Sequence, residues 1–380
     1  MLVESCLESP RSNRVTVIDE PQPLPKELPA RWPTITRRLL AVARVLVALY
    51  CFVVALDLLK QGAVGIGALL KAVSAHGFTN LVGFGWLGAY LSLSGSPVAA
   101  LSLGLLGGGA ITSIETLGMI NGSRLGASFI VLVTGFMYYM RGGSRGRGVI
   151  SMGILSMLTT ATTYLPAMAV AIYLLQSGVL DPVRFGSTAW TRSILDVVID
   201  PVIGLIPRGI PPLVLFGAGY AGLLLSFRLF DRALPHVETQ QLQHGRFGAW
   251  IHRPRTMFVV GLLVTSLTLS VSVSLSVLVP LAARGFVGRT TVIPYIMGAN
   301  ITTFVDTLFA ALLLANPHAF TVVLAEMIAV TAVSLLILFA AFEPYQRGLL
   351  ALNSAIATNR ARFAVFVGVL AAIPVVLMLV

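Results

Sequence analysis

Serine hydroxyls recur at one spacing in the two halves of the chain. A shift of 176 residues places Ser94 on Ser270 and Ser96 on Ser272. Hydroxyls and backbone N–H groups at the start of a helix can hold the oxygens of an anion, helped by the positive end of the helix dipole. Serines in apolar helices also cap, pack or bond back to the preceding turn. The repetition favours the first interpretation and predicts an anion site formed by both halves.

The same shift aligns a second polar segment further along each half. It places Gly122 on Gly298 and Arg124 on Asn300, without a gap between the serines and this segment. A serine pair and a glycine-centred segment that keep one spacing indicate a duplicated unit.

Arg124 is the sharpest single candidate for binding. An arginine within an apolar crossing is costly and usually functional, and its planar guanidinium can grip a tetrahedral oxyanion with two hydrogen bonds. Two alternatives remain open on sequence alone. The side chain can extend towards a membrane interface, or Glu115 or Asp306 can neutralise it.

Acidic residues are few in the apolar parts of the chain. Asp306, which follows the pair Thr302 and Thr303, can ligate a cation, carry a proton or pair with Arg124. We favour the pairing with Arg124. Glu115 and Glu326 are single acids in apolar surroundings, and no role is assigned to them beyond the possible pairing of Glu115 with Arg124.

Motifs for enzymatic chemistry are absent from the sequence. There is no phosphate-binding glycine loop, no Gly-x-Ser-x-Gly segment and no zinc-ligand spacing of His or Cys. We therefore expect no catalytic residue and no enzyme activity.

The composition indicates a membrane protein with several spans. Hydrophobic residues make up 56% of the 380 residues and charged residues only 11%, whereas charged residues supply about a quarter of a soluble chain. The net charge is +11, and the arginines that carry it lie in short loops between apolar runs. This is the distribution that holds loops on the cytoplasmic side of the membrane, and it argues against nucleic acid as a partner.

The apolar runs then predict the elements that must position the candidate residues. In the first half, we expect a span over 39–60, a surface segment over 62–78, and a hairpin over 80–111 that turns near Ser94–Pro97. A span over 112–140, broken at 121–123, and a span over 149–175 follow. In the second half, we expect elements over 212–230, 257–281, 290–314 (broken at 298–300), 320–342 and 363–380.

The arginine bias sets the orientation and the domain plan. The expected parts are a disordered cytoplasmic tail (1–36), a first membrane repeat (37–180), an interfacial linker (181–210), a second membrane repeat (211–342), and an interfacial segment with a last span (343–380). An odd number of crossings in each repeat inverts the second copy. The expected fold is therefore an all-α polytopic membrane protein with two inverted-topology repeats, each with a re-entrant hairpin and a broken transmembrane helix. We expect it in the plasma membrane, with a cytoplasmic N-terminus.

The paired blocks resemble the sodium–phosphate cotransporter family. Its inverted repeats each carry a Gln-Ser-Ser-Ser hairpin and a Gly-Ala-Asn-Ile-Gly-Thr break, and the best match here is Pro294–Thr303. The chain departs from this pattern at both glutamines (Leu93 and Leu269), at both middle serines (Gly95 and Val271) and at the first asparagine (Arg124).

The resemblance implies where substrate and sodium would bind. It places anion and sodium binding on Ser94, Ser96, Ser270, Ser272, Asn300, Thr302 and Thr303. The residues themselves add Gly95 and Arg124 to the anion site, and Asp306 to the cation site beside Asn300, Thr302 and Thr303. No cofactor is expected beyond a sodium ion.

The expected function is secondary transport of a small inorganic anion, with phosphate as the first candidate. Sodium or protons would drive it, at a midplane site between the two repeats. The alternative is a membrane scaffold or sensor that keeps the fold and has lost transport, because Leu93, Leu269 and Val271 each remove a polar group from the site.

Overall fold

The regular elements that the computed structural model describes are all α-helices. The structure describes residues 34–72, 77–140, 146–183, 209–233, 253–268, 288–314 and 316–380, together with a few isolated residues between these ranges. Residues 41–380 form one compact unit, and residues 1–40 are a separate unit of which only the last seven are described. The expected tail and most of the expected 181–210 linker lie outside the described residues.

Seven helical segments among the described residues are long and apolar enough to cross a membrane: six single helices and the segment Arg289–Leu313, which contains two helices. The first half contains α1 (Thr34–Ala72), α2 (Phe78–Ser92), α3 (Ser96–Gly107), α4 (Ser113–Met140) and α5 (Gly146–Gln176). The second half contains α7 (Pro212–Ala233), α9 (Pro254–Thr268), α11 (Arg289–Thr302), α12 (Phe304–Leu313), α13 (Pro317–Ala340), α14 (Phe342–Thr358) and α15 (Arg360–Leu379). The protein is therefore a membrane protein whose described regular elements are all helices, as its composition predicts.

The first helix is longer than the sequence predicts. The apolar run suggests a span over 39–60 and a surface segment from 62 onward, but α1 continues to Ala72. Gly62 and Ala63 are buried, because α7 packs directly against this part of α1. A Cβ added at Gly62 would lie 2.4 Å from the backbone nitrogen of Phe216. The apolar span therefore extends to Gly67, and the surface assignment is wrong for residues 62–67.

The two short arms expected in the first half are present. α2 ends at Ser92 and α3 begins at Ser96, with Pro97 in its first turn, where a missing N–H costs nothing. Between them, Leu93 adopts a left-handed conformation with φ 51°, which ends α2 abruptly. The hairpin turn thus lies at residues 93–95, beside the expected position.

The break expected in the fourth helix is absent. α4 runs from Ser113 to Met140 through Asn121, Gly122 and Ser123. The polar side chains bond back into their own helix: Asn121 Nδ2 donates to the Leu117 carbonyl at 3.2 Å, and Ser123 Oγ donates to the Ile120 carbonyl at 2.7 Å. Gly122 does not break the helix but allows α2 to pack closely against it.

That close packing occurs twice, at the spacing of the sequence repeat. The 176-residue shift carries Phe78, the first residue of α2, onto Pro254, the first residue of α9. In the first half, a Cβ at Gly85 would lie 2.0 Å from the Met119 carbonyl oxygen. In the second half, a Cβ at Gly261 would lie 2.1 Å from the Tyr295 carbonyl oxygen, and Tyr295 corresponds to Met119.

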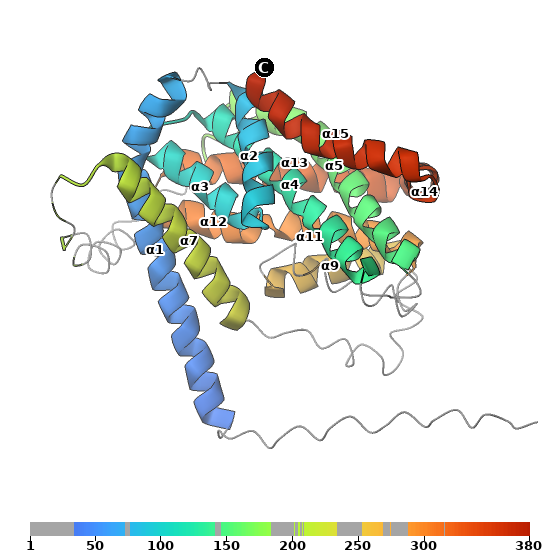
Figure 1. The fold of residues 1–380 in the computed structure, drawn as a ribbon, viewed down its shortest axis with the longest axis horizontal. Helices are drawn as coiled ribbons and strands as arrows, with labels where there is room; N and C mark the ends of the chain where they lie inside the picture. Colours follow the sequence, from blue (N-terminus) through green and yellow to red (C-terminus); the bar gives the residue numbers. More distant parts are fainter. Residues whose placement is uncertain are drawn as a thin grey trace, which may run out of the picture. The chain divides into compact units, whose positions relative to one another are not determined.

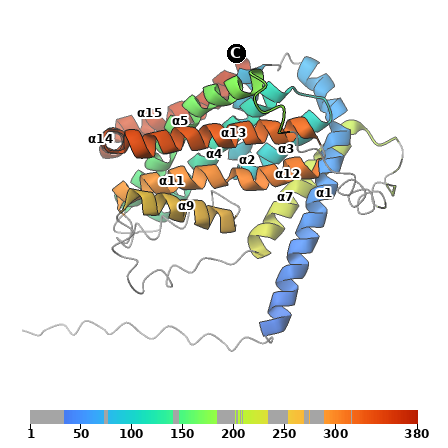
Figure 2. The same cartoon turned by 180° about the vertical axis from the view of Figure 1, so that it is seen from behind.

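A second pair of glycines repeats the same relationship. A Cβ at Gly122 would lie 2.0 Å from the Val82 carbonyl oxygen, and one at Gly298 would lie 2.1 Å from that of Phe258. The pairs α2–α4 and α9–α11 therefore pack backbone to backbone in the same register, as small residues permit in membrane helices. Figure 1 shows α2 beside α4, and Figure 2 shows α9 beside α11.

The helix of the second half that matches α4 is interrupted. α11 ends at Thr302, α12 begins at Phe304, and Thr303 lies between them (Figure 2). The sequence predicts a break at Gly298, Ala299 and Asn300, but these three residues are helical and buried. The interruption therefore lies at Thr303, three residues after the predicted break at 298–300.

Candidate functional site

The buried guanidinium of Arg124 joins the first half of the chain to the interruption in the second. The residue lies within α4 and is 4% exposed. Its Nη1 donates to Thr303 Oγ1 at 3.0 Å, and its Nη2 donates to the Thr303 carbonyl at 3.2 Å and to Thr307 Oγ1. Thr303 keeps helical backbone angles and donates its N–H to the Ala299 carbonyl at 3.2 Å, so the interruption is confined to this residue, whose own carbonyl accepts from Arg124.

The negative partner of Arg124 is Asp306. Arg124 Nη2 lies 3.6 Å from Asp306 Oδ1, and both side chains are buried. Thr307 Oγ1 donates to the same carboxyl oxygen at 2.8 Å. The pairing that the sequence favours is therefore present, and an extension of Arg124 towards a membrane interface is wrong. At 3.6 Å, however, the pair is longer than a charge-assisted hydrogen bond of about 2.7–2.9 Å.

Glu115, the other acid considered for Arg124, has a different position. Its carboxylate accepts hydrogen bonds from the backbone N–H of Thr112 at 2.7 Å and of Gly77 at 3.1 Å. Thr112 precedes α4, so the two residues form a capping box that satisfies the start of this helix.

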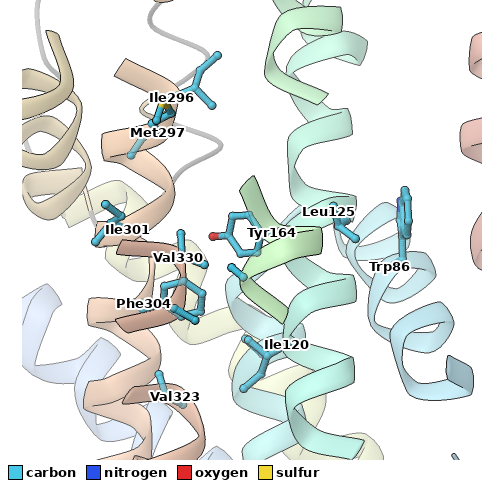
Figure 3. Close-up of a cluster of buried hydrophobic side chains, with 14 of the residues drawn as sticks. Trp86, Ile120, Leu125, Tyr164, Ile296, Met297, Ile301, Phe304, Val323 and Val330 are labelled. Carbon is cyan, nitrogen blue, oxygen red and sulfur yellow. The ribbon is translucent and has the colours of Figure 1, made fainter. Parts of the chain in front are cut away.

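Asn300 is held from α5. Tyr164 Oη donates to the Asn300 carbonyl at 2.8 Å, and Asn300 Nδ2 donates to Thr160 Oγ1 at 3.2 Å. Figure 3 shows the Tyr164 hydroxyl pointing towards the helix that carries Ile301, with Phe304 below it. Arg124 lies over the ring of Phe304, 5.1 Å from its centre, a distance at which a cation is attracted to the ring.

The structure thus brings four of the predicted site residues together. They are Arg124, Asn300, Thr303 and Asp306, and all lie around the α11–α12 interruption. Thr302 is buried, and its hydroxyl points back to the carbonyls of Gly298 and Ala299 at 3.4 and 3.5 Å. Ser270 and Ser272 lie outside the described residues.

The turn between α2 and α3 packs against α4 beside Arg124. A Cβ at Gly95 would lie 2.8 Å from the carbonyl oxygen of Ser123, the residue before Arg124. Ser96 is buried and Ser94 is partly exposed. The hydrogen bonds of the Arg124 guanidinium go to Thr303 and Thr307, and none goes to Ser94 or Ser96.

Several buried polar atoms of this region have no hydrogen-bond partner among the described residues. They are Arg124 Nε, Asp306 Oδ2, Asn121 Oδ1 and both carboxyl oxygens of Glu326. Glu326 lies on α13 and is 0% exposed. Buried polar atoms are normally bonded, and unsatisfied ones of this kind mark a place for a ligand, a water molecule or a proton.

A cavity among α1, α7 and α12 has Asp306 in its lining. Its volume is about 320 Å³, and Thr268 and Asp306 lie on its wall beside apolar side chains of α1, α7 and α12. The residue that pairs with Arg124 therefore contributes to the wall of this cavity.

Sequence reasoning missed the residues that hold the site from α5 and α12. Tyr164 and Thr160 lie four residues apart on one face of α5, in the run Thr159–Tyr164 that is rich in hydroxyls within an apolar span. Thr307 follows Asp306 directly. A run of hydroxyls in such a span is a signal for polar contacts between helices, and it was available in the sequence.

Comparison of the chain with family models, with curated proteins and with solved structures finds no match in any of the three.

Proposed function

We propose that this protein is a secondary transporter of a small inorganic anion, with phosphate as the first candidate. The observation that carries the proposal is the position of Arg124. A fully desolvated guanidinium, which belongs to one copy of a repeated sequence, is bound to the interrupted helix of the other copy. A cation at the meeting point of two repeats is where a transported anion would find a counter-charge.

The repeated packing supports a duplicated architecture. The 176-residue shift relates the first residues of α2 and α9 and the glycine contacts of both helix pairs. Transporters of this kind are built from inverted repeats, with re-entrant hairpins and interrupted helices around a midplane site. We propose the same plan here, with the interruption confined to the second copy. The resemblance to the sodium–phosphate cotransporter family belongs to this proposal.

Asp306 then acts as a stand-in for the anion. Its Oδ1 lies 3.6 Å from Arg124 Nη2, and its Oδ2 has no hydrogen-bond partner among the described residues. An oxyanion that reaches Arg124 would replace this long contact with two shorter hydrogen bonds. Rocking of the repeats would open the site to each side of the membrane in turn.

One observation favours a second candidate, a scaffold or sensor that has lost transport. Thr303, Thr307 and Asp306 already occupy Nη1 and Nη2 of Arg124 and leave only Nε unpartnered. In this reading the guanidinium is a permanent bridge between the two halves, and no anion displaces Asp306.

Counterflow in proteoliposomes separates the two candidates. Unlabelled phosphate trapped inside should accelerate the entry of labelled phosphate if the protein is a transporter. Sulfate and arsenate are tested in parallel, with empty liposomes as the control. Entry no faster than in empty liposomes for all three anions would reject transport and favour the scaffold.

A further inference from the structure

Arg124, Asp306 and Glu326 are buried charged residues of one region, here called the charged cluster. The proposed function uses Arg124 and Asp306 but gives no role to Glu326. Glu326 lies on the face of α13 that also carries Val323 and Val330, and these two valines face the core around Tyr164 and Phe304 in Figure 3. Its side chain is completely buried, and neither carboxyl oxygen has a hydrogen bond among the described residues.

The charges of the cluster do not balance if every group is ionised. Arg124 supplies one positive charge, and Asp306 and Glu326 supply two negative charges. Arg124 forms its ion pair with Asp306. A buried carboxylate without its own counter-ion or hydrogen bonds is strongly disfavoured, and such a group takes up a proton instead.

The neighbours of Glu326 are few and can be named. Arg124 and Asn121 on α4 act on its carboxyl, although the Asn121 amide lacks the geometry of a hydrogen bond. Tyr164 on α5 interacts electrostatically with Arg124, Asp306 and Glu326. The three charged groups therefore lie in one region.

The other helices packed on α13 bring titratable groups that are engaged elsewhere or exposed. Tyr295 of α11 bonds to Ser274, and Tyr345 of α14 bonds to Thr162. Arg289 on α11 and Glu343 and Arg347 on α14 are exposed, and α3 has no titratable side chain. Arg124 is therefore the single cation that the described residues bring near Glu326.

We propose that Glu326 is the proton-binding residue of this site and that it holds its proton when an anion is bound. This inference rests on the proposed function. With Glu326 neutral, the charges of Arg124 and Asp306 cancel, and an oxyanion can compete for the guanidinium. With Glu326 ionised, the site has a net negative charge that repels the anion and offers Arg124 a second carboxylate. Anion and proton binding then reinforce one another, and the coupling ion is a proton.

The first test reads the proton directly and needs no transport. Infrared spectra of the purified protein show the C=O stretch of a protonated carboxyl, which disappears on ionisation. A solvent-exposed glutamate is ionised above about pH 6. We expect wild type to keep a protonated-carboxyl band above that pH, Glu326→Gln to lose it, and Glu343→Gln, which changes an exposed acid, to retain it.

The second test reads the coupling. Sulfate is the preferred probe, because its charge stays constant where phosphate titrates, and phosphate is measured beside it. We expect addition of anion to weakly buffered protein to take up protons, and the Kd of wild type to rise by up to about tenfold per pH unit above the transition of Glu326. Glu326→Gln should bind without proton uptake and with a Kd that is flat over the same range.

The outcomes separate the two proposals. A wild-type spectrum without the protonated band above about pH 6, or a band that survives Glu326→Gln, overturns the assignment of Glu326. Anion binding with equal proton uptake in wild type and Glu326→Gln overturns the coupling. If no anion binds to or passes through any variant, the proposed function fails and the coupling with it, while the infrared band still decides whether Glu326 holds a proton.

Discussion

Arg124 on α4 donates a hydrogen bond of 3.0 Å to Thr303, the residue that separates α11 from α12. The two residues belong to different copies of the repeated sequence, and 179 positions separate them in the chain. In the repeat alignment, Arg124 takes the position of Asn300, whose own side chain turns to Thr160 on α5. The two equivalent positions therefore make different contacts on either side of one site.

The ion pair between Arg124 and Asp306 should contribute strongly to stability. Arg124→Met leaves the buried Asp306 carboxyl without its cation, and breaking a buried pair in this way costs about 3–5 kcal/mol. Asp306→Asn in the same protein should restore part of this loss, because the uncompensated charge is removed. Thermal unfolding in detergent measures both changes. Arg347→Ala, on the exposed face of α14, is the matched control and should have no effect. Losses that simply add in the double variant would show that the two side chains do not interact.

The glycine contacts predict equal sensitivity in both halves. Gly85→Ala and Gly261→Ala each place a methyl group about 2 Å from a carbonyl oxygen of the neighbouring helix, so the helices must move apart. Overpacking of this kind costs about 1–3 kcal/mol or more. Gly217→Ala on α7 is the control, since no atom lies within 4 Å of its added Cβ. It should be neutral or stabilising by up to about 1 kcal/mol, the helix preference of alanine over glycine. Sensitivity at only one of the two contact glycines would argue against equivalent helix pairs.

The spacing of the serines and glycines predicts the α2–α3 hairpin and the correspondence of α2 with α9, because both depend on local sequence. The break expected in α4 is wrong for a physical reason. In sequence, Gly122 suggests a helix break, but in the structure the absence of its side chain lets α2 approach. Asn121 and Ser123, which suggest a loop in sequence, satisfy their side chains within the helix.

The partners of Arg124 could be predicted only in part. Charge alone suggests Asp306, because few acids lie in apolar segments. Thr303, Thr307 and the backbone carbonyl contact Arg124 through tertiary packing, which no local pattern encodes. The same is true of Tyr164, whose hydroxyl reaches Asn300 from a separate helix.

The arginine distribution predicts which ends of the helices face the cytoplasm. With the N-terminus inside, the loop between α5 and α7 is external, and α14 is cytoplasmic. Val179→Cys and Gly348→Cys test this in a background in which Cys6 and Cys51 are replaced, because both introduced positions are exposed. An impermeant maleimide added to intact cells should label Val179→Cys. It should label Gly348→Cys only after the membrane is opened. Labelling of Gly348→Cys in intact cells would reject this orientation.

The last prediction concerns sodium. Arg124 stands where the second copy has Asn300, and a guanidinium there brings a permanent positive charge to a place that a sodium ion would otherwise help to fill. Two positive charges about 4 Å apart repel by about 4 kcal/mol at an effective dielectric constant near 20. Asp306, which lies 3.6 Å from Arg124, cancels part of this repulsion. The repulsion energy is therefore smaller than this value.

We therefore expect anion binding to wild type to depend weakly on sodium. Arg124→Ala should lose anion affinity, and Arg124→Asn, which gives both copies the same residue, should gain sodium dependence. The measurement is anion binding to purified protein in sodium and in choline, with Arg347→Ala as the control for a lost surface charge. A steep rise of wild-type affinity with sodium, together with full affinity in Arg124→Ala, would mean that the guanidinium only holds α4 against the α11–α12 interruption and plays no part in coupling.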